Sequence, residues 1–452
     1  MVWQTTMNES ERLGDRVLER RRPKVRAPLL DVREDTESRI RSTVDQSGPP
    51  PARTWWDPIH VRDRLQVPEL LLAPYRLVRH IIRNRRILTV AKLMNVAKVE
   101  VSALLHLRRT IGLPTVVKIE TTNGCNTFCQ LCPTGNLLQS RAKGLMPREE
   151  FERIVDEVKA HAYVIDLTQW GDPMIHPDIY DLIRYVHDAR VYSYISTNFH
   201  GFQAGDADRL VASGLDELTV SLHGLTQESY EAYQPGKDLA EILERVKAVV
   251  AAKERAGARF PKIAINFVVT AKNEHEIEWV PAFAEELGVG FKVEPASMNL
   301  RFLHKDSHLQ STDTSPEDRA DRIKAHLTEW LPKSSRSSEW TNPVYKEILE
   351  HGDLNGGQSA ARGEDPLASD RKMTKCDWLW RKAVIHWDGA VVPCCGVYDK
   401  KWTFDSIKDK PFKEIWRGPH YLASRETFHG ENAPDDSDAP ETPCTGCPGW
   451  ML

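Results

Sequence analysis

Three cysteines of this chain, Cys125, Cys129 and Cys132, lie on one short segment with the spacing CxxxCxxC. Three thiolates on one loop can each bind one iron of a [4Fe–4S] cube. The next cysteine is Cys376, far along the chain, so the fourth iron would lack a nearby thiolate. An iron with an open position can bind a small ligand, as the metal of a catalytic zinc site does. The spacing therefore predicts a reactive iron–sulfur centre.

A zinc ion is the alternative occupant of this loop. Zinc sites usually combine a CxxC pair with further cysteines or histidines nearby. The nearest histidines, His106 and His161, do not have ligand spacing relative to the loop. The sequence therefore favours iron, and a zinc-binding interaction protein is the non-enzyme alternative.

A second group of cysteines lies near the C-terminus. A hairpin turn at residues 388–389 would bring Cys394 back toward Cys376, and Cys444 and Cys447 form a CxxC pair. The segment has little apolar sequence for a core of its own, so metal ligation would contribute much of its folding free energy. Four thiolates suit either zinc or an iron–sulfur cluster, and the residue types alone leave both open.

Composition narrows the class of protein. The chain has 452 residues, of which 40% are hydrophobic and 28% charged, and its net charge is −4. This balance does not indicate a nucleic-acid partner. The sequence contains no apolar run of transmembrane length and no apolar signal-peptide core, so we expect no membrane span. Cysteines grouped like metal ligands are typical of a reducing compartment, which predicts a cytoplasmic location.

Composition shifts divide the chain into five predicted segments. Residues 1–54 are polar and charged and are expected to form a disordered tail. Residues 55–114 have apolar residues at helical spacing and are expected to form a helical extension. Strand and helix patterns alternate over residues 115–300, which predicts six βα units around a parallel, barrel-like sheet. Residues 301–375 form a linker or insertion, and residues 376–452 form the cysteine-rich module.

The expected strands of the α/β region cover residues 116–120, 163–169, 191–197, 216–221, 262–269 and 290–294. The expected helices cover residues 147–160, 177–188, 206–213, 228–233, 240–254 and 274–287, and two further helices are expected at 316–330 and 344–351.

The cysteine loop, placed directly after the first strand of this series, resembles that of radical S-adenosylmethionine (SAM) enzymes. The resemblance implies a partial (β/α)6 TIM-like barrel with catalytic groups at the carboxyl ends of the strands. It also implies that SAM binds the open iron of a [4Fe–4S] cluster and is cleaved to a 5′-deoxyadenosyl radical, which abstracts a substrate hydrogen. A flavodoxin- or ferredoxin-type protein is the implied reductant.

Three loop and strand-end motifs resemble the SAM-binding positions of this family. Trp170-Gly171-Asp172-Pro173 resembles a Gly-Gly-Glu-Pro turn in which Trp170 replaces the first glycine and Asp172 the glutamate. The positions near the SAM carboxylate and ribose correspond to Ser196, Asn198, Ser221 and His223. A capped turn residue is an equally good interpretation of His223.

The C-terminal cysteines resemble the SPASM or twitch auxiliary-cluster modules of radical SAM enzymes. The resemblance implies one auxiliary [4Fe–4S] cluster with four protein ligands, which are Cys376, Cys394, Cys444 and Cys447. Cys395 is then left over. A thiol near a substrate radical can donate a hydrogen atom, and the alternative is an inert thiol beside the cluster.

The resemblance extends to enzymes that modify a sugar or cyclitol portion of a natural product, the avilamycin-type oligosaccharide epimerases among them. Residues 60–112 do not look like the winged-helix leader-recognition domain of many peptide-modifying relatives. We therefore expect a small, carbohydrate-like substrate and epimerisation with Cys395 as hydrogen donor. The alternatives are dehydrogenation of a secondary alcohol through the auxiliary cluster and radical maturation of a peptide.

Overall fold

The structure is a computed structural model. It describes residues 85–298, 316–334, 337, 340–341, 343–351, 376, 378–428, 439–444 and 447. The tail expected over residues 1–54, the extension as far as residue 84 and most of the segment 301–375 lie outside the described residues.

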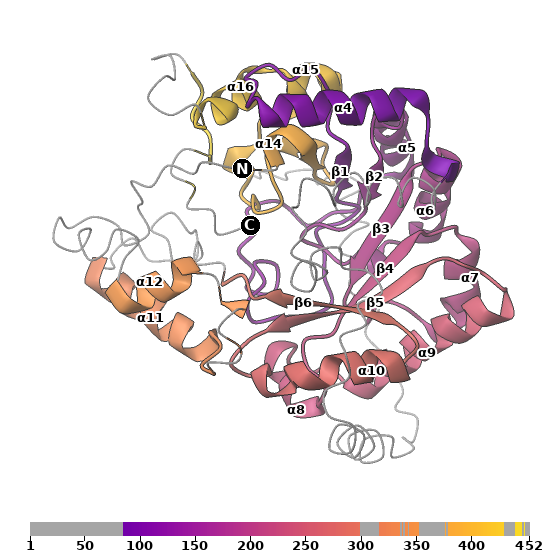
Figure 1. Cartoon of the computed structure of the whole chain (residues 1–452), viewed down its shortest axis with the longest axis vertical. Helices are drawn as coiled ribbons and strands as arrows, with labels where there is room; N and C mark the ends of the chain where they lie inside the picture. Colours follow the sequence, from indigo (N-terminus) through magenta and orange to yellow (C-terminus); the bar gives the residue numbers. More distant parts are fainter. Residues whose placement is uncertain are drawn as a thin grey trace, which may run out of the picture.

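Six parallel strands form the centre of the molecule, in the order of the sequence (Figure 1). They are β1 (Val116–Ile119), β2 (Val164–Asp166), β3 (Tyr192–Thr197), β4 (Glu217–Ser221), β5 (Lys262–Val269) and β6 (Gly290–Pro295). The helices between them are α5 (Arg148–Val158), α6 (Ile179–Asp188), α7 (Ala207–Ala212), α8 (Gln227–Tyr233), α9 (Leu239–Arg255) and α10 (Val280–Glu286). The expected series of six βα units is confirmed.

The sheet curves with its helices on the outer side (Figure 1). Alternation along the strands explains this arrangement, because successive side chains point to opposite faces. On β1, Val117 and Ile119 are fully buried in the core that includes Phe151 and Ile154 of α5. Lys118 lies between them and faces the inner side. The outer face is therefore apolar, and the inner face carries polar groups.

The C-terminal module extends this sheet. Its strand β7 (Lys382–Ile385) pairs in parallel with β1, and β8 (Ala390–Val392) and β9 (Asp405–Ser406) continue antiparallel to give nine strands. The expected hairpin turn is present, and Gly389 adopts a φ of +84°, which favours glycine. Backbone hydrogen bonds between β7 and β1 therefore join the module to the sheet of the barrel.

The helix expected over residues 274–287 is divided into the 3-10 helix η5 (Glu274–Trp279) and α10. Pro281 stands in the first turn of α10, where its missing N–H does not interrupt the helix.

The other helices surround the barrel. They are α4 (Val90–Leu104) in the extension, α11 (Pro316–Trp330), α12 (Pro343–His351), α14 (Trp378–Arg381), α15 (Phe412–Trp416), α16 (Pro419–Glu426) and the short helices η2 (Arg85–Ile87), η3 (Pro173–Ile175), η4 (Ala204–Asp206) and η8 (Lys400–Trp402). In the described part of the chain, no helix combines the length and apolarity that crossing a membrane requires.

Candidate active site

The three cysteines of the first loop face a common set of polar groups. The Thr127 hydroxyl lies 3.2 Å from Cys125 Sγ and 3.5 Å from Cys129 Sγ. Asn198 Nδ2, from the carboxyl end of β3, donates to Cys125 Sγ at 3.3 Å. Gln234 Nε2 approaches Cys129 Sγ at 3.6 Å. Neighbouring segments therefore hold the thiols at one place.

These thiols are poorly suited to carry charge on their own. Burial raises the pKa of Cys125, and the negative charges of Asp172 and Cys129 raise it further. Burial and the charge of Cys132 raise the pKa of Cys129 to about 11. A bound iron cluster would supply the positive charge that deprotonates such thiols. The donor set therefore fits an iron–sulfur cluster.

Asp172 ties the predicted SAM-binding turn to its surroundings. The residue is 3% exposed, and its carboxylate accepts hydrogen bonds from the Asn198 backbone N–H at 2.7 Å and the Thr197 hydroxyl at 2.8 Å. Its own N–H donates to the Gly124 carbonyl at 2.8 Å. Asp172 thus holds the end of β3 beside the cysteine loop. Its carboxylate forms hydrogen bonds within the protein that stabilise this arrangement.

Gly171 permits the turn to lie against the cysteine loop. A Cβ atom at this position would be 2.0 Å from the Thr122 carbonyl oxygen and 2.6 Å from that of Gly124. These are backbone atoms of the neighbouring loop, which cannot move aside as a flexible side chain can. Only glycine fits there.

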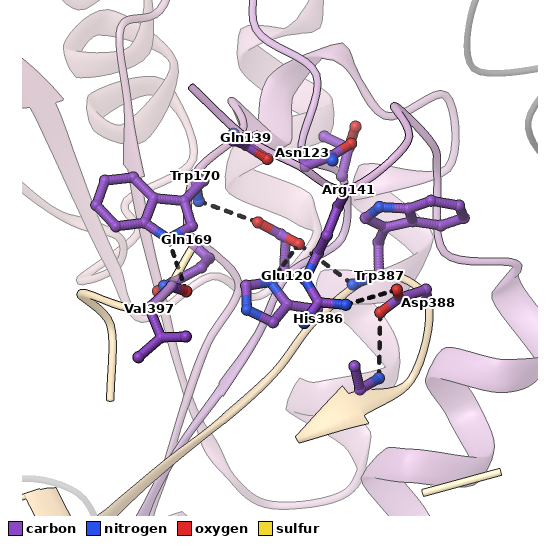
Figure 2. Close-up of polar contacts among 12 residues, drawn as sticks. Glu120, Asn123, Gln139, Arg141, Gln169, Trp170, His386, Trp387, Asp388 and Val397 are labelled. Carbon is purple, nitrogen blue, oxygen red and sulfur yellow. Dashed lines mark hydrogen bonds and ion pairs between the residues drawn. The ribbon is translucent and has the colours of Figure 1, made fainter. Parts of the chain in front are cut away.

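Trp170 connects the same turn to the loop that follows β8. Its indole Nε1 donates to the Val397 carbonyl at 3.2 Å (Figure 2). Its ring packs edge-on against Tyr398, with 5.7 Å between the ring centroids. The neighbouring Gln169 donates from Nε2 to the Cys395 carbonyl at 2.8 Å. A glycine in place of Trp170 would lack the indole contacts. The turn therefore positions the backbone of the loop that carries Cys395.

The remaining predicted SAM contacts lie at the ends of β3 and β4. The Ser196 N–H donates to the Thr168 hydroxyl at 2.7 Å. Ser221 is in register with Asn266 of β5, whose buried side-chain oxygen Oδ1 accepts no hydrogen bond from the described residues. That oxygen is a free acceptor beside Ser221.

His223 is buried in the structure rather than open to a ligand. It is 7% exposed, its Nδ1 accepts the Val268 N–H at 3.3 Å, and its ring packs against Tyr233 at 4.5 Å. Burial lowers its pKa to about 4, so the ring is neutral at physiological pH. The interpretation of His223 as a satisfied structural residue is therefore supported by its surroundings, although its ring lies near the cysteine loop through Tyr233.

Four C-terminal cysteines gather at a second place. Burial raises the pKa of Cys394, and the charges of Cys395, Cys444 and Cys447 add to the effect. Burial also raises the pKa of Cys444 to about 12, with contributions from the charges of Cys447 and Cys376. These mutual effects show that the four predicted ligands Cys376, Cys394, Cys444 and Cys447 lie close together.

A different set of charged groups acts on Cys395, the fifth cysteine of the C-terminal region. Burial raises its pKa, while the positive charges of Lys118 on β1 and Lys382 on β7 oppose that rise and Asp166 of β2 adds to it. Charged groups of the barrel sheet therefore act on this thiol, whereas the charges that act on Cys394 come from other cysteines.

The spacing of the thiols can be compared with the needs of one metal ion and of a cluster. Within the described ranges, no three His, Cys, Asp or Glu side chains form a group that could hold one ion. Ligands of one zinc ion must all approach it to about 2.3 Å, whereas the thiolates of a cube each bind a different iron.

Several polar residues of the site were missed by the sequence reasoning. Lys118 and Asp166 lie in two of the predicted strands, which were recognised from their apolar residues. A charged residue between apolar residues of a strand indicates a side chain on the opposite face of the sheet, and this pattern could have identified both. Lys237 lies between two expected helices and was given no role. Burial lowers its pKa, and the charges of Cys125 and Glu241 counteract this. Its ammonium group therefore lies near the cysteine loop.

Two known domains match these two regions. The radical SAM superfamily matches residues 119–278, and the iron–sulfur cluster-binding SPASM domain matches residues 376–448. The chain combines a radical SAM domain with a SPASM domain. The radical SAM domain carries a [4Fe–4S] cluster and binds SAM, and the SPASM domain carries auxiliary iron–sulfur centres. The predicted cofactors are thereby confirmed.

Similar proteins share parts of this radical SAM–SPASM chain. The AdoMet-dependent heme synthase of Methanosarcina barkeri is 28% identical over 175 residues, which is 39% of this chain and about half (48%) of that protein. The PqqA peptide cyclase of Ruegeria pomeroyi is 25% identical over 327 residues, 71% of this chain and 78% of that protein. The crystal structure of Streptococcus suis SuiB bound to its precursor peptide SuiA has a TM-score of 0.48 and 16% identity, covering 73% of this chain and 70% of that one. The sugar- or cyclitol-modifying subtype stays a prediction.

Proposed function

We propose that this radical SAM protein inverts a carbon centre in a carbohydrate or cyclitol portion of a natural product, with Cys395 as hydrogen-atom donor. The observation that carries the proposal is the placement of Cys395. Gln169 Nε2 donates to the Cys395 carbonyl at 2.8 Å, and burial keeps the Cys395 thiol in the protonated form that a hydrogen-atom donor needs. Lys118 and Asp166 of the barrel are among the charged groups that act on this thiol.

In this proposal the two cysteine groups have separate tasks. Cys125, Cys129 and Cys132 hold the cluster that binds SAM. The auxiliary cluster has the ligands Cys376, Cys394, Cys444 and Cys447. Four protein thiolates would saturate that cluster, which favours an electron-transfer or structural role over substrate binding.

The residues around the first loop bind and orient SAM. The turn from Trp170 to Pro173, with Ser196, Asn198 and Ser221, would surround SAM, and His223 would support this site from behind through Tyr233. Lys237 offers an ammonium group beside the cysteine loop for the SAM carboxylate. When bound and reduced, the cluster and SAM supply a 5′-deoxyadenosyl radical that takes a hydrogen atom from an unactivated C–H bond.

Cys395 completes the inversion from the opposite side of the substrate carbon. The S–H bond breaks, a C–H bond forms, and the sulfur is left as a thiyl radical. One electron from a flavodoxin- or ferredoxin-type reductant and one proton from solvent restore the thiol. SAM is consumed once in each turnover.

Peptide maturation is the second candidate. It is favoured by the similarity to the PqqA peptide cyclase and to the mycofactocin maturase MftC of Mycobacterium ulcerans, which is 27% identical over 183 residues. Dehydrogenation of a secondary alcohol is the third possibility, with the auxiliary cluster as electron acceptor.

The test uses reduced holoenzyme, SAM and deuterated water with a panel of oligosaccharides, cyclitols and short peptides. We expect an epimer that carries one deuterium, because a thiol exchanges with solvent. Cys395→Ser should still form 5′-deoxyadenosine but should release no epimer. A product two mass units lighter, without deuterium and with near-normal turnover in Cys395→Ser, supports dehydrogenation. An altered peptide with the saccharides unchanged supports peptide maturation, and either result overturns the proposal.

A further inference from the structure

A row of polar side chains crosses the inner face of the barrel. Lys118, Asp166, Tyr194 and Glu217 are consecutive partners in the register of β1, β2, β3 and β4. Lys292 of β6 reaches the same row from the next part of the sheet. The neighbours of Lys118 along its strand are fully buried against the helices, so the strand directs this charge inward.

The row consists of two ion pairs around one phenol ring. Lys118 Nζ lies 2.5 Å from Asp166 Oδ2, and Lys292 Nζ lies 3.1 Å from Glu217 Oε1. Lys292 also lies over the ring of Tyr194, 5.1 Å from its centroid. Each of these charged side chains keeps between 12% and 28% of its surface exposed. The charged side chains of the row are therefore mostly buried, but a ligand could still reach them.

Stability does not account for these pairs. Withdrawing two charges from water costs several kcal/mol for each ion, and apolar replacements of such pairs are often as stable or more so. The pKa of both lysines is nevertheless raised. Burial opposes the charge of Lys118, yet the interactions with Asp166, Cys395 and Tyr194 outweigh it, and Tyr194 and Glu217 have the same effect on Lys292.

We propose that this row, Lys118–Asp166 and Lys292–Glu217 with Tyr194 between them, binds the hydroxyl groups of a neutral, polyhydroxylated substrate. The inference rests on the proposed function and adds the residues that would select the substrate. The two positive and two negative charges cancel, so neither an anionic nor a cationic ligand is favoured. Hydroxyl groups both donate and accept, and they match a row that offers ammonium donors and carboxylate acceptors side by side.

This chemistry separates a saccharide from the other substrate classes. A phosphate or carboxylate would approach Asp166 or Glu217 at close range, where like charges repel. An apolar peptide side chain would displace water from the two ion pairs without offering a hydrogen bond in return, which costs binding free energy. A cyclitol or sugar can form hydrogen bonds with both members of each pair.

The test measures equilibrium binding to SAM-loaded holoenzyme without reductant, by anaerobic calorimetry. The probes are myo-inositol, maltotriose, myo-inositol 1-phosphate and an uncharged capped tripeptide. The variant Lys118→Met/Asp166→Leu removes one pair without leaving a lone charge. The matched control, Lys247→Met/Glu244→Leu, removes an exposed pair on the outside of α9. Iron content and circular dichroism verify that each variant is folded.

We expect myo-inositol or maltotriose to bind and to bind at least tenfold more weakly to the inner-face variant, with the control unchanged. Equal affinity in variant and wild type overturns the proposal, as does binding of only the tripeptide or the phosphate, or of none of the four probes. Since no reductant is present, the result is independent of SAM cleavage and of hydrogen donation by Cys395. Failure of the row and failure of the proposed reaction are thus separate observations.

Discussion

The Oε2 atom of Glu120 lies 2.8 Å from Nδ1 of His386, and both side chains are almost completely buried. Glu120 directly precedes the cysteine loop, and His386 directly follows β7 of the SPASM domain. The same carboxylate accepts the backbone N–H groups of Trp170 at 3.2 Å and Trp387 at 3.3 Å (Figure 2). One side chain therefore joins the cluster loop, the predicted SAM-binding turn and the auxiliary domain.

Replacing this carboxylate should weaken the contact between the two domains. Glu120→Gln keeps the shape of the side chain but turns an amide N–H₂ toward donors. We expect a loss of about 2 kcal/mol in the free energy of unfolding, measured by urea denaturation, with faster hydrogen exchange over residues 386–392. Glu100→Gln, which breaks a surface pair with Arg381, is the control and should cost less than about 1 kcal/mol. Equal effects of the two substitutions would contradict this role of Glu120.

Trp170→Gly restores the glycine of the resembled motif and should release the loop of Cys395. The substitution removes the hydrogen bond to Val397 and the ring contact with Tyr398. Hydrogen exchange over residues 394–398 should increase severalfold, whereas the amides of β3 and β4 should be unaffected. Gln169→Leu, which removes the bond to the Cys395 carbonyl, should act in the same direction. Unchanged exchange in both variants would show that the turn does not hold this loop.

The iron content of the protein should divide between the two cysteine groups. Anaerobic wild-type protein should hold about eight irons, from two [4Fe–4S] clusters. Substituting alanine for Cys125, Cys129 and Cys132 together should halve the iron and abolish 5′-deoxyadenosine formation. Cys444→Ala should lower the iron too and should destabilise residues 376–447 more than the barrel. Stoichiometric zinc in the anaerobic wild type would refute the assignment.

Acid should destabilise the barrel through His161. Its ring donates from Nδ1–H to the Pro114 carbonyl at 3.0 Å and stacks on Phe412 of α15 at 6.0 Å. Burial lowers its pKa from 6.5 to about 4. Between these values the unfolded chain binds a proton that the native protein does not, so stability falls as the pH falls through this window.

The full contribution of this shift is about 3 kcal/mol. In His161→Gln, the unfolding free energy should change less steeply between pH 6.5 and 4 than in the wild type, as followed by urea denaturation at each pH. Identical slopes would assign the acid sensitivity to other groups.

Local sequence patterns determined the elements of this protein. Each strand and helix of the barrel follows from the periodicity of its own residues, and the hairpin follows from Asp388-Gly389. The family and its cofactors were readable in the cysteine spacing, because ligand spacing on one loop is also a local property. The roles of Cys395 and of the individual SAM contacts stay predictions that the experiments above can test.

The tertiary structure decided which distant segments meet. The pairing of β1 with β7 joins residues more than 250 positions apart, and no local pattern specifies such a partner. The same holds for Glu120 with His386 and for Trp170 with Val397. Lys118 and Glu217 could be assigned to strands from their neighbours, but their place in one row depends on the register of four strands. Register and long-range pairing arise from the packing of the whole chain, which is why only the folded molecule shows them.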